Sequence, residues 1–204
     1  MPAFHSFTAS LPWSIGLSMT ILGALLVLLV SCQTPNQSVM RVADFQRAIA
    51  EAKATAIPKG SPEEDAAIAR VTAFLSDLSP ANVAATTKEV YAEDAYFNDT
   101  LKTLRGVEDI EEYLLETAHT VTSISVEFDD VARSGQDHYF RWRMDFQAPK
   151  LRKGETIRTI GITQIRFNNE GKVVLHQDFW DSTAGLFEHL PVTNQIVNAV
   201  KKRL

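Results

Sequence analysis

The stretch Tyr139–Gln147, which reads YFRWRMDFQ, decides the fold class because large apolar side chains alternate with polar ones along it. Such alternation is typical of a β-strand with one face in a core. The apolar face carries Phe140, Trp142, Met144 and Phe146, and the polar face carries Tyr139, Arg141, Arg143 and Asp145. Two interpretations of the polar face are open. It is either a solvated outer surface, as is usual in an antiparallel sheet, or the wall of a cavity into which Arg143 and Asp145 point.

Three further strands are expected around this one, over Thr122–Val131, Thr156–Phe167 and Lys172–Trp180. The turns between the four strands are short enough for antiparallel hairpins, and each contains glycine together with polar residues. A short additional strand is expected at Ala95–Asn98. The sequence therefore predicts a sheet built mainly from a C-terminal meander.

Helical periodicity precedes the meander. Ser61-Pro62-Glu63-Glu64 is a strong helix start, with serine as the N-cap and proline in the first turn, and the helix is expected to end at Ser79-Pro80. Other helices are expected over Val42–Lys53, Val83–Tyr91, Val107–Ala118 and Val192–Leu204. Helices followed by a meander predict an α+β fold.

The composition excludes several classes of protein. The chain has 204 residues and a formal net charge of −5, which disfavours an electrostatic nucleic-acid binder. A single cysteine forms neither an internal disulfide nor a cysteine-based zinc site, and the histidines lack metal-ligand spacing. We therefore expect no metal and no cofactor.

The 45 charged residues all lie at or after Arg41, so the N-terminus is a separate region. Ile15–Val30 is apolar over sixteen residues, nearer the length of a secretory signal core than of a membrane-spanning helix. Leu29-Val30-Ser31-Cys32 resembles the bacterial lipobox, which implies cleavage before Cys32 and lipidation of that residue. The absence of Lys and Arg before the apolar run leaves an uncleaved anchor as the alternative. Both interpretations predict a bacterial membrane-anchored protein whose domain lies outside the cytoplasm.

These boundaries predict four segments: a signal peptide or anchor over 1–32, a tether and first helix over 33–60, a folded domain over 61–190 and a C-terminal helix over 191–204. Polar side chains interrupt two strands of that domain. His176 and Asp178 share a strand face with Val174 and Trp180, and Tyr96 and Asn98 share one face of the short strand. A carboxylate among apolar side chains has either a partner or a raised pKa.

Three features that follow one another along the chain resemble the nuclear-transport-factor-2-like superfamily. They are the helix-rich start, the segment Tyr91–Ala95 and the final hairpin that ends in Asp178-Phe179-Trp180-Asp181. That superfamily includes SnoaL-like polyketide cyclases, ketosteroid isomerases and limonene-1,2-epoxide hydrolases. The resemblance implies a curved antiparallel sheet that closes over N-terminal helices as a cone, with a pocket for a small apolar ligand or substrate. Dimers through the outer face of the sheet are common in this fold, and exposure of Trp142 or Phe140 would support a homodimer.

The sequence resembles two site patterns within the superfamily to different extents. The segment that ends in Asp99 is similar to the one that carries the general base of ketosteroid isomerases. The isomerase pattern also needs two hydrogen-bond donors for the substrate oxygen, but the matching stretches hold Phe74 and a position at about Ile160, and neither side chain can donate a hydrogen bond. The limonene-epoxide hydrolase pattern is matched at all five functional positions, by Tyr96-Phe97-Asn98, Arg143-Met144-Asp145 and Asp178-Phe179-Trp180.

This resemblance implies a role for each matched residue. Asp178 would be the base that takes a proton from water, Tyr96 and Asn98 would orient that water, Asp145 would be the acid, and Arg143 would hold both carboxylates. The sequence thus predicts a membrane-tethered, cofactor-free epoxide hydrolase. The alternatives are a non-catalytic SnoaL-like lipoprotein that binds an apolar ligand, or isomerase or cyclase chemistry in the same pocket. In a cyclase- or dehydratase-like variant, His176 would be the base.

Overall fold

The computed structural model describes residues 37–52 and 57–203. The predicted signal segment, Cys32 and residues 33–36 lie outside this range. The chain divides into two compact units, Met1–Asp44 and Phe45–Leu204, and the site described below lies entirely in the second. Of the first unit the structure describes only the beginning of helix α2, which runs over Gln37–Glu51.

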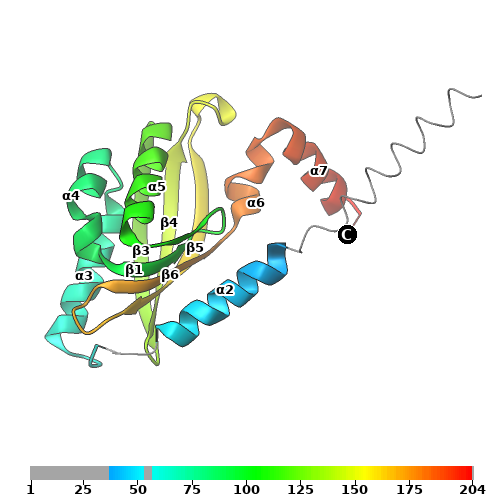
Figure 1. Cartoon of the computed structure of the whole chain (residues 1–204). Coiled ribbons are helices and arrows are strands. Elements are labelled where there is room, and N and C mark those ends of the chain that lie inside the picture. The colour runs from blue at the N-terminus through cyan, green and yellow to red at the C-terminus, as the bar shows by residue number, and fades with distance from the viewer. Residues whose placement is uncertain (1–36, 53–56, 204) are drawn as a thin grey trace, which may run out of the picture. The chain divides into compact units, whose positions relative to one another are not determined.

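The α+β order predicted from the sequence is confirmed (Figure 1). Helices α3 (Pro62–Ser76) and α4 (Pro80–Val90) precede strands β1 (Tyr91–Asn98) and β2 (Thr103–Arg105). Helix α5 (Val107–Thr120) leads into strands β3 (Ser123–Ser134), β4 (Asp137–Gln147), β5 (Ile157–Phe167) and β6 (Val173–Trp180), which are followed by helices α6 (Ser182–Gly185) and α7 (Pro191–Lys201).

Serine–proline pairs set the starts of α3 and α4. The Ser61 side chain accepts a hydrogen bond from the backbone N–H of Glu64, and Ser79 does the same for Asn82. Each serine is followed by a proline in the first turn, where its missing N–H leaves no bond unmade. Ser79-Pro80, expected as the end of a helix, therefore also begins the next one.

The six strands form one sheet in the order β2-β1-β6-β5-β4-β3. All neighbours are antiparallel except β1 and β6, which run parallel, so the antiparallel sheet that the family resemblance implies is found with this one parallel pair at β1 and β6. The four C-terminal strands are joined by hairpins, which force antiparallel pairing. β1 and β6 are joined through the whole meander, so no tight turn fixes their relative direction.

The main core lies between the inner face of the sheet and helices α3, α4 and α5. Phe74, Val83 and Ile110 from the three helices pack there against Phe140 and Ile165 from the sheet. Phe140 and Trp142 are both buried, so the exposure that would have supported a homodimer through these residues is not found.

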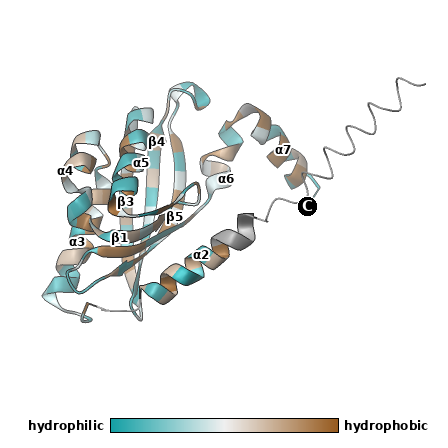
Figure 2. Ribbon diagram, in the orientation of Figure 1, coloured by the Kyte–Doolittle hydropathy of each residue, from teal (hydrophilic) through white to brown (hydrophobic). Residues whose placement is uncertain are grey.

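A second, smaller cluster lies on the outer face of the sheet. Ala48 is buried with Tyr96 and Leu175, and Phe45, Ile49 and Ala52 pack against them. Figure 2 shows hydrophobic and hydrophilic positions interspersed along α2, as expected for a helix with one apolar face. This part of α2 therefore covers β1 and β6 from outside.

Several boundaries differ from the expected ones. α2 begins at Gln37, within the stretch expected to be a tether, and β1 begins at Tyr91 rather than at Ala95. Strand β2 and helix α6 were not expected, because three- and four-residue elements leave no periodic pattern. None of the helices within the described ranges combines the length and apolar character needed to cross a membrane.

Candidate functional site

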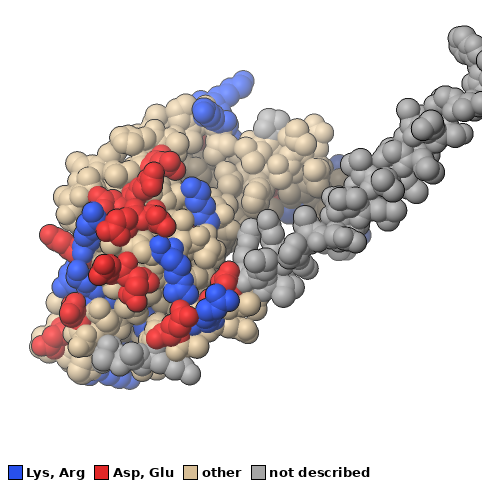
Figure 3. Space-filling view, viewed as in Figure 1, with Lys and Arg blue, Asp and Glu red and all other residues tan. Residues whose placement is uncertain are grey.

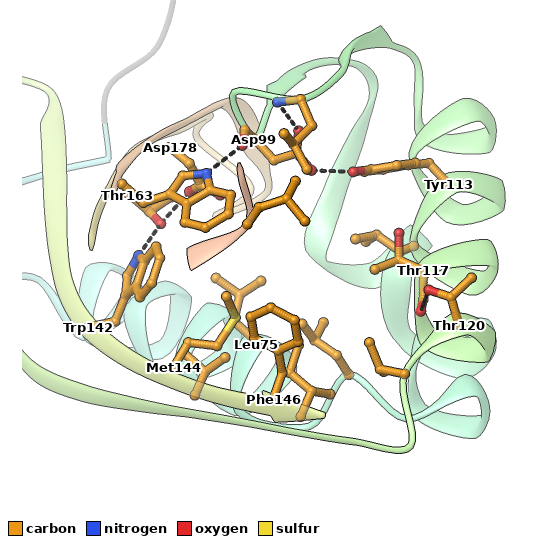
Figure 4. A pocket seen from close by; sticks show the side chains of 18 of the residues that line it. Leu75, Asp99, Tyr113, Thr117, Thr120, Trp142, Met144, Phe146, Thr163 and Asp178 are labelled. Carbon is orange, nitrogen blue, oxygen red and sulfur yellow. Dashed lines mark hydrogen bonds between the residues drawn. The ribbon is translucent and has the colours of Figure 1, made fainter. Parts of the chain in front are cut away.

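A cavity of about 350 Å³ lies between the inner face of the sheet and helices α3 and α5. Its walls are mainly aliphatic and aromatic, with Leu75 from α3, Leu78 from the segment between α3 and α4, Leu114 from α5, and Met144 and Phe146 from β4. In Figure 4, Leu75, Met144 and Phe146 lie at one end of the cavity, and Asp99 and Asp178 lie at the other. An apolar cavity with a few convergent polar groups is the usual form of a small-molecule site.

Asp178 is the carboxylate that the polar end presents to the cavity. Its Oδ1 accepts hydrogen bonds from the Thr163 hydroxyl at 2.5 Å and from His176 Nε2 at 3.0 Å. Thr163 in turn accepts one from the indole N–H of Trp142 at 2.8 Å, so its own proton is directed to Asp178. Oδ2 of Asp178 accepts no hydrogen bond from the described residues, and the side chain is 17% exposed. This oxygen is therefore available to a bound molecule.

Asp99 lies at the same end but is fully engaged. Its Oδ1 accepts the backbone N–H groups of Leu101 at 2.9 Å and Lys102 at 2.8 Å, and its Oδ2 accepts the hydroxyl of Tyr113. Burial, and then the charge of Asp99, raise the pKa of Tyr113 well above its usual value, so this hydroxyl keeps its proton at neutral pH. Trp180 donates its indole N–H to the backbone oxygen of Asp99 at 2.8 Å, which ties the end of β6 to the end of β1.

The structure does not bring Arg143 and Asp145 to this cavity. Both lie on the outer face of the sheet. Arg143 is paired with Glu127 and Asp129, and Asp145 is paired with Arg158 at 3.0 Å. Their side chains are 58% and 44% exposed. The expectation that Arg143 holds Asp145 and Asp178 together is therefore wrong, because Met144 and its apolar neighbours occupy the inner face of β4. The solvated interpretation of the polar face holds.

Tyr96 and Asn98 also point away from the cavity. Both are buried on the outer side of β1, Tyr96 in the cluster with Ala48. The Tyr96 hydroxyl contacts Gln177 at 3.3 Å, and Asn98 donates to the Tyr96 hydroxyl at 3.3 Å and to Thr103 at 2.7 Å. They cannot orient water beside Asp178, because residues of the opposite parity in β1 face the cavity.

The remaining sequence candidates are placed as follows. Asp178 and His176 line the cavity, and so does Asp99, the base in the isomerase pattern. Phe74 is in the core, and Ile160 is 65% exposed on the outer face, so neither completes that pattern. No group of His, Cys, Asp or Glu side chains in residues 37–52 and 57–203 is arranged to hold a metal ion.

Sequence reasoning missed Thr163, Tyr113 and the pairing of Tyr91 with His176. The turn between β5 and β6 gave no reliable signal for Thr163. Counting back from that turn on both strands would place Thr163 opposite Gln177, but the register shifts between Arg166 and Phe167, and Thr163 pairs with Asp178. Tyr113 falls on the buried side of α5, one turn after Ile110. Tyr91 could not be placed, because a register irregularity lies between it and Tyr96.

The chain resembles known proteins both in sequence and in fold. The profile of the SnoaL-like domain matches residues 71–176. No curated protein sequence matches the chain. Among solved structures, a limonene-epoxide-hydrolase-like epoxide hydrolase of Mycobacterium tuberculosis superposes with a TM-score of 0.52 at 16% identity, over 68% of this chain and 96% of that one.

Two further structures show the same fold. A putative SnoaL-like polyketide cyclase from Jannaschia sp. CCS1 gives a TM-score of 0.52 at 14% identity, over 62% of this chain and 93% of that one. TsrD from Streptomyces laurentii gives 0.51 at 16% identity, over 66% and 98%. At these identities the likeness concerns the fold alone. The matched profile covers just over half of the chain, from within α3 to within β6, so the chain belongs to the SnoaL-like family of nuclear-transport-factor-2-like folds.

Proposed function

We propose that the domain is an enzyme that binds a small, uncharged and largely hydrocarbon substrate in the cavity and uses Asp178 as its general base. The observation that carries the proposal is the state of the Asp178 carboxylate. One oxygen is fixed by Thr163 and His176, and the other accepts no hydrogen bond from the described residues, in a carboxylate that lines a mainly apolar cavity. A base needs such an oxygen within reach of the proton that it takes.

The lining also supports the class of substrate. The residues that line the cavity include no lysine or arginine, and two of them are aspartates. An anionic substrate would therefore meet like charge without a cation to compensate for it. A molecule with a hydrocarbon body and one neutral polar group would place the body against Leu75 and Met144 and the polar group at Asp178.

Addition of water to an epoxide is the reaction that we propose to test first. Asp178 Oδ2 would take a proton from water while the water oxygen bonds to an epoxide carbon and the ring C–O bond breaks. Asp145 is too remote to protonate the departing oxygen. The Tyr113 hydroxyl lines the same cavity but donates its proton to Asp99, so a second water molecule would protonate the departing oxygen, and the resulting hydroxide would take the proton back from Asp178. The fold is shared with an epoxide hydrolase-like structure, which supports this choice only at the level of fold.

The experiment incubates the full chain, purified in detergent, with cyclic and aliphatic epoxides and measures diol formation. Asp178→Asn should lower turnover by about 10²- to 10⁴-fold, the usual contribution of a general base. Asp145→Asn is the matched control, because it makes the same chemical change on the outer face and should leave turnover unchanged. Turnover that survives Asp178→Asn would refute the assignment of the base.

A second candidate function is binding of an apolar ligand without catalysis. It is favoured by the hydrogen bonds among the polar groups themselves, since Asp99 is saturated by Tyr113 and two backbone N–H groups. Diol formation would exclude this candidate. Saturable binding of an apolar fluorescent probe that Met144→Asp abolishes, without turnover of any epoxide, would favour it.

For the N-terminus, we propose lipidation of Cys32 and membrane attachment of the domain outside the cytoplasm. The support is the Leu29-Val30-Ser31-Cys32 sequence after an apolar run. Mass spectrometry of the protein from bacterial membranes should show a diacylated or triacylated Cys32. Cys32→Ser should abolish that modification, whereas an uncleaved anchor would retain residues 1–31 in both forms.

A further inference from the structure

Behind Asp178 lies a chain of two hydrogen bonds, of which the one farther from Asp178 is buried and the other is partly buried. The Tyr91 hydroxyl and His176 Nδ1 are 2.9 Å apart, and His176 Nε2 and Asp178 Oδ1 are 3.0 Å apart. Tyr91 and His176 are 1% and 2% exposed. The imidazole also packs against the ring of Phe97, with 4.5 Å between ring centroids. Tyr91 thus contacts Asp178 only through the histidine.

The positions of the protons follow from the donors and acceptors present. Burial, and then the charge of Asp178, raise the pKa of Tyr91 well above its usual value, so its hydroxyl keeps its proton. Among the described residues that hydroxyl has no hydrogen-bond partner except His176. If Tyr91 donates to Nδ1, its proton is satisfied, and the ring must carry its own proton on Nε2, where Asp178 accepts it.

The alternative protonation states each leave an unfavourable contact. A doubly protonated His176 would donate Nδ1–H to Tyr91, and the buried Tyr91 proton would then lack an acceptor. A neutral ring with its proton on Nδ1 would place the Nε2 lone pair against the Asp178 carboxylate. Only the neutral Nε2–H tautomer satisfies Tyr91, His176 and Asp178 together.

We propose that Tyr91 and His176 are positioning residues, which hold His176 as the neutral Nε2–H tautomer and thereby fix Asp178 with Oδ1 occupied and Oδ2 facing the substrate. This assignment deepens the proposed function and rests on it for its catalytic meaning. Because the donor to Asp178 is neutral, the carboxylate is oriented without the cation that would make it a weaker base. Thr163 supplies the second neutral donor to the same oxygen.

The same contacts argue against His176 as the base itself. Both of its ring nitrogens are engaged, Nδ1 by Tyr91 and Nε2 by Asp178. The ring therefore acts on a substrate only through Asp178. The other titratable groups around Asp178 are Asp99 and Tyr113, and neither makes a hydrogen bond to the imidazole.

The primary test is independent of catalysis. Long-range ¹H–¹⁵N correlation spectra of the histidine-labelled full chain in detergent distinguish the tautomers of each imidazole. The His176 signals are assigned by their loss in His176→Gln. At neutral pH they should show a protonated Nε2 and an unprotonated Nδ1. An Nδ1–H tautomer or a doubly protonated ring at neutral pH would overturn the proposal.

Tyr91→Phe provides the second measurement. Loss of the donor to Nδ1 should admit the other tautomer, with a protonated Nδ1. An unchanged His176 pattern would show that Tyr91 positions nothing. If Tyr91→Phe does not fold, the spectrum of the unaltered chain still decides the tautomer.

Where Asp178-dependent turnover is found, the two positioning residues should affect kcat more than KM. Tyr91→Phe should lower kcat by up to about a hundredfold, the scale of a misplaced reacting group. His176→Gln, which retains a neutral donor, should keep more activity than His176→Leu. Equal losses in both would contradict positioning by a neutral donor. An absence of turnover in every assay would count against the proposed function and leave the tautomer result standing.

Discussion

Two buried histidines in this domain each contact a carboxylate, and the two pairs differ in which atom lacks a partner. Glu64, at the start of α3, accepts hydrogen bonds on Oε1 from His138 at 2.7 Å and from Arg133, and on Oε2 from the backbone N–H of Gly60 at 2.5 Å. Asp178 accepts both of its hydrogen bonds on one oxygen and leaves the other open to the cavity.

The two histidines differ in whether Nδ1 has a hydrogen-bond partner, and here the atom without one belongs to the Glu64 pair. Nδ1 of His138 is buried without a hydrogen-bond partner, whereas Nδ1 of His176 is held by Tyr91. The Glu64 pair therefore has an arginine and a saturated carboxylate, which suits a fixed link among α3, β3 and β4. The Asp178 pair has neutral partners and an open oxygen, which suits proton transfer. Burial of a histidine–carboxylate pair alone does not distinguish a structural role from a functional one.

The largest expected effect is on stability, at Glu64. Glu64→Ala would leave Arg133 and His138 without their buried acceptor, and breaking a buried pair in this way costs about 3–5 kcal/mol. Urea unfolding of the full chain in detergent measures the difference. Asp178→Asn keeps the shape of its side chain and removes no cation's partner, so its free energy of unfolding should change by about 1 kcal/mol. Equal losses of unfolding free energy in Glu64→Ala and Asp178→Asn would contradict the proposed difference between the two histidine–carboxylate pairs.

The contacts of Glu64 should also make the free energy of unfolding depend on pH in the acid range. Burial raises the pKa of Glu64, but hydrogen bonds from Gly60, His138 and Arg133 lower it by more, so the folded-state pKa lies below the usual 4.5. The stabilisation is therefore complete above pH 4.5 and is lost as the pH falls through the folded-state pKa. Glu64→Gln should be least stable relative to the unaltered chain at neutral pH, and the gap in unfolding free energy should narrow in acid. A gap that widens on acidification would contradict the sign.

A third prediction concerns the support of Asp178. Gly161 lies against two indoles, and a Cβ at this position would come within 2.6 Å of Trp142 Cη2 and 2.8 Å of Trp180 Cβ. Gly161→Ala should displace Trp142, which holds Thr163, and cost about 1–3 kcal/mol of stability by overpacking. It should also weaken turnover or probe binding in the cavity. Ile160→Ala, at the exposed neighbouring position, is the control and should change the unfolding free energy by about 0.5 kcal/mol or less.

The fold was largely predictable because its signals are local. Strand periodicity around Trp142, the serine–proline caps at Ser61 and Ser79, and the hairpin turns each depend on a few adjacent residues. Parity also sorted the side chains of β4 correctly into two faces. It could not determine what covers the polar face, since that depends on elements distant in sequence.

The candidate site was predicted at Asp178 and missed at the other four positions for this reason. Arg143 and Asp145 find their partners across neighbouring strands on the outer surface. Tyr96 and Asn98 are buried by contacts on the side away from the cavity, where α2 packs over Tyr96. A motif of matching residue types in the right order does not fix the face on which each residue lies, because a shift of one position in a strand reverses it.

The smallest expected effect is at the outer face. Asp145 is 44% exposed and its partner Arg158 is 81% exposed, so the Coulomb energy of the pair is screened by water and offset by side-chain ordering. Asp145→Asn should change the unfolding free energy by less than about 1 kcal/mol and should leave turnover and probe binding unaltered. Arg143→Gln should behave in the same way, since Arg143 contacts only other exposed or half-exposed acids. Figure 3 shows acidic side chains on the face that carries α5 with basic ones beside them, and the ion pairs of α5 are Lys88 with Glu111 at 3.1 Å and Lys102 with Glu116 at 3.8 Å. A large loss of turnover in either variant, with stability unchanged, would mean that these residues reach a substrate after all. The division between a charged outer face and a catalytic inner face would then fail.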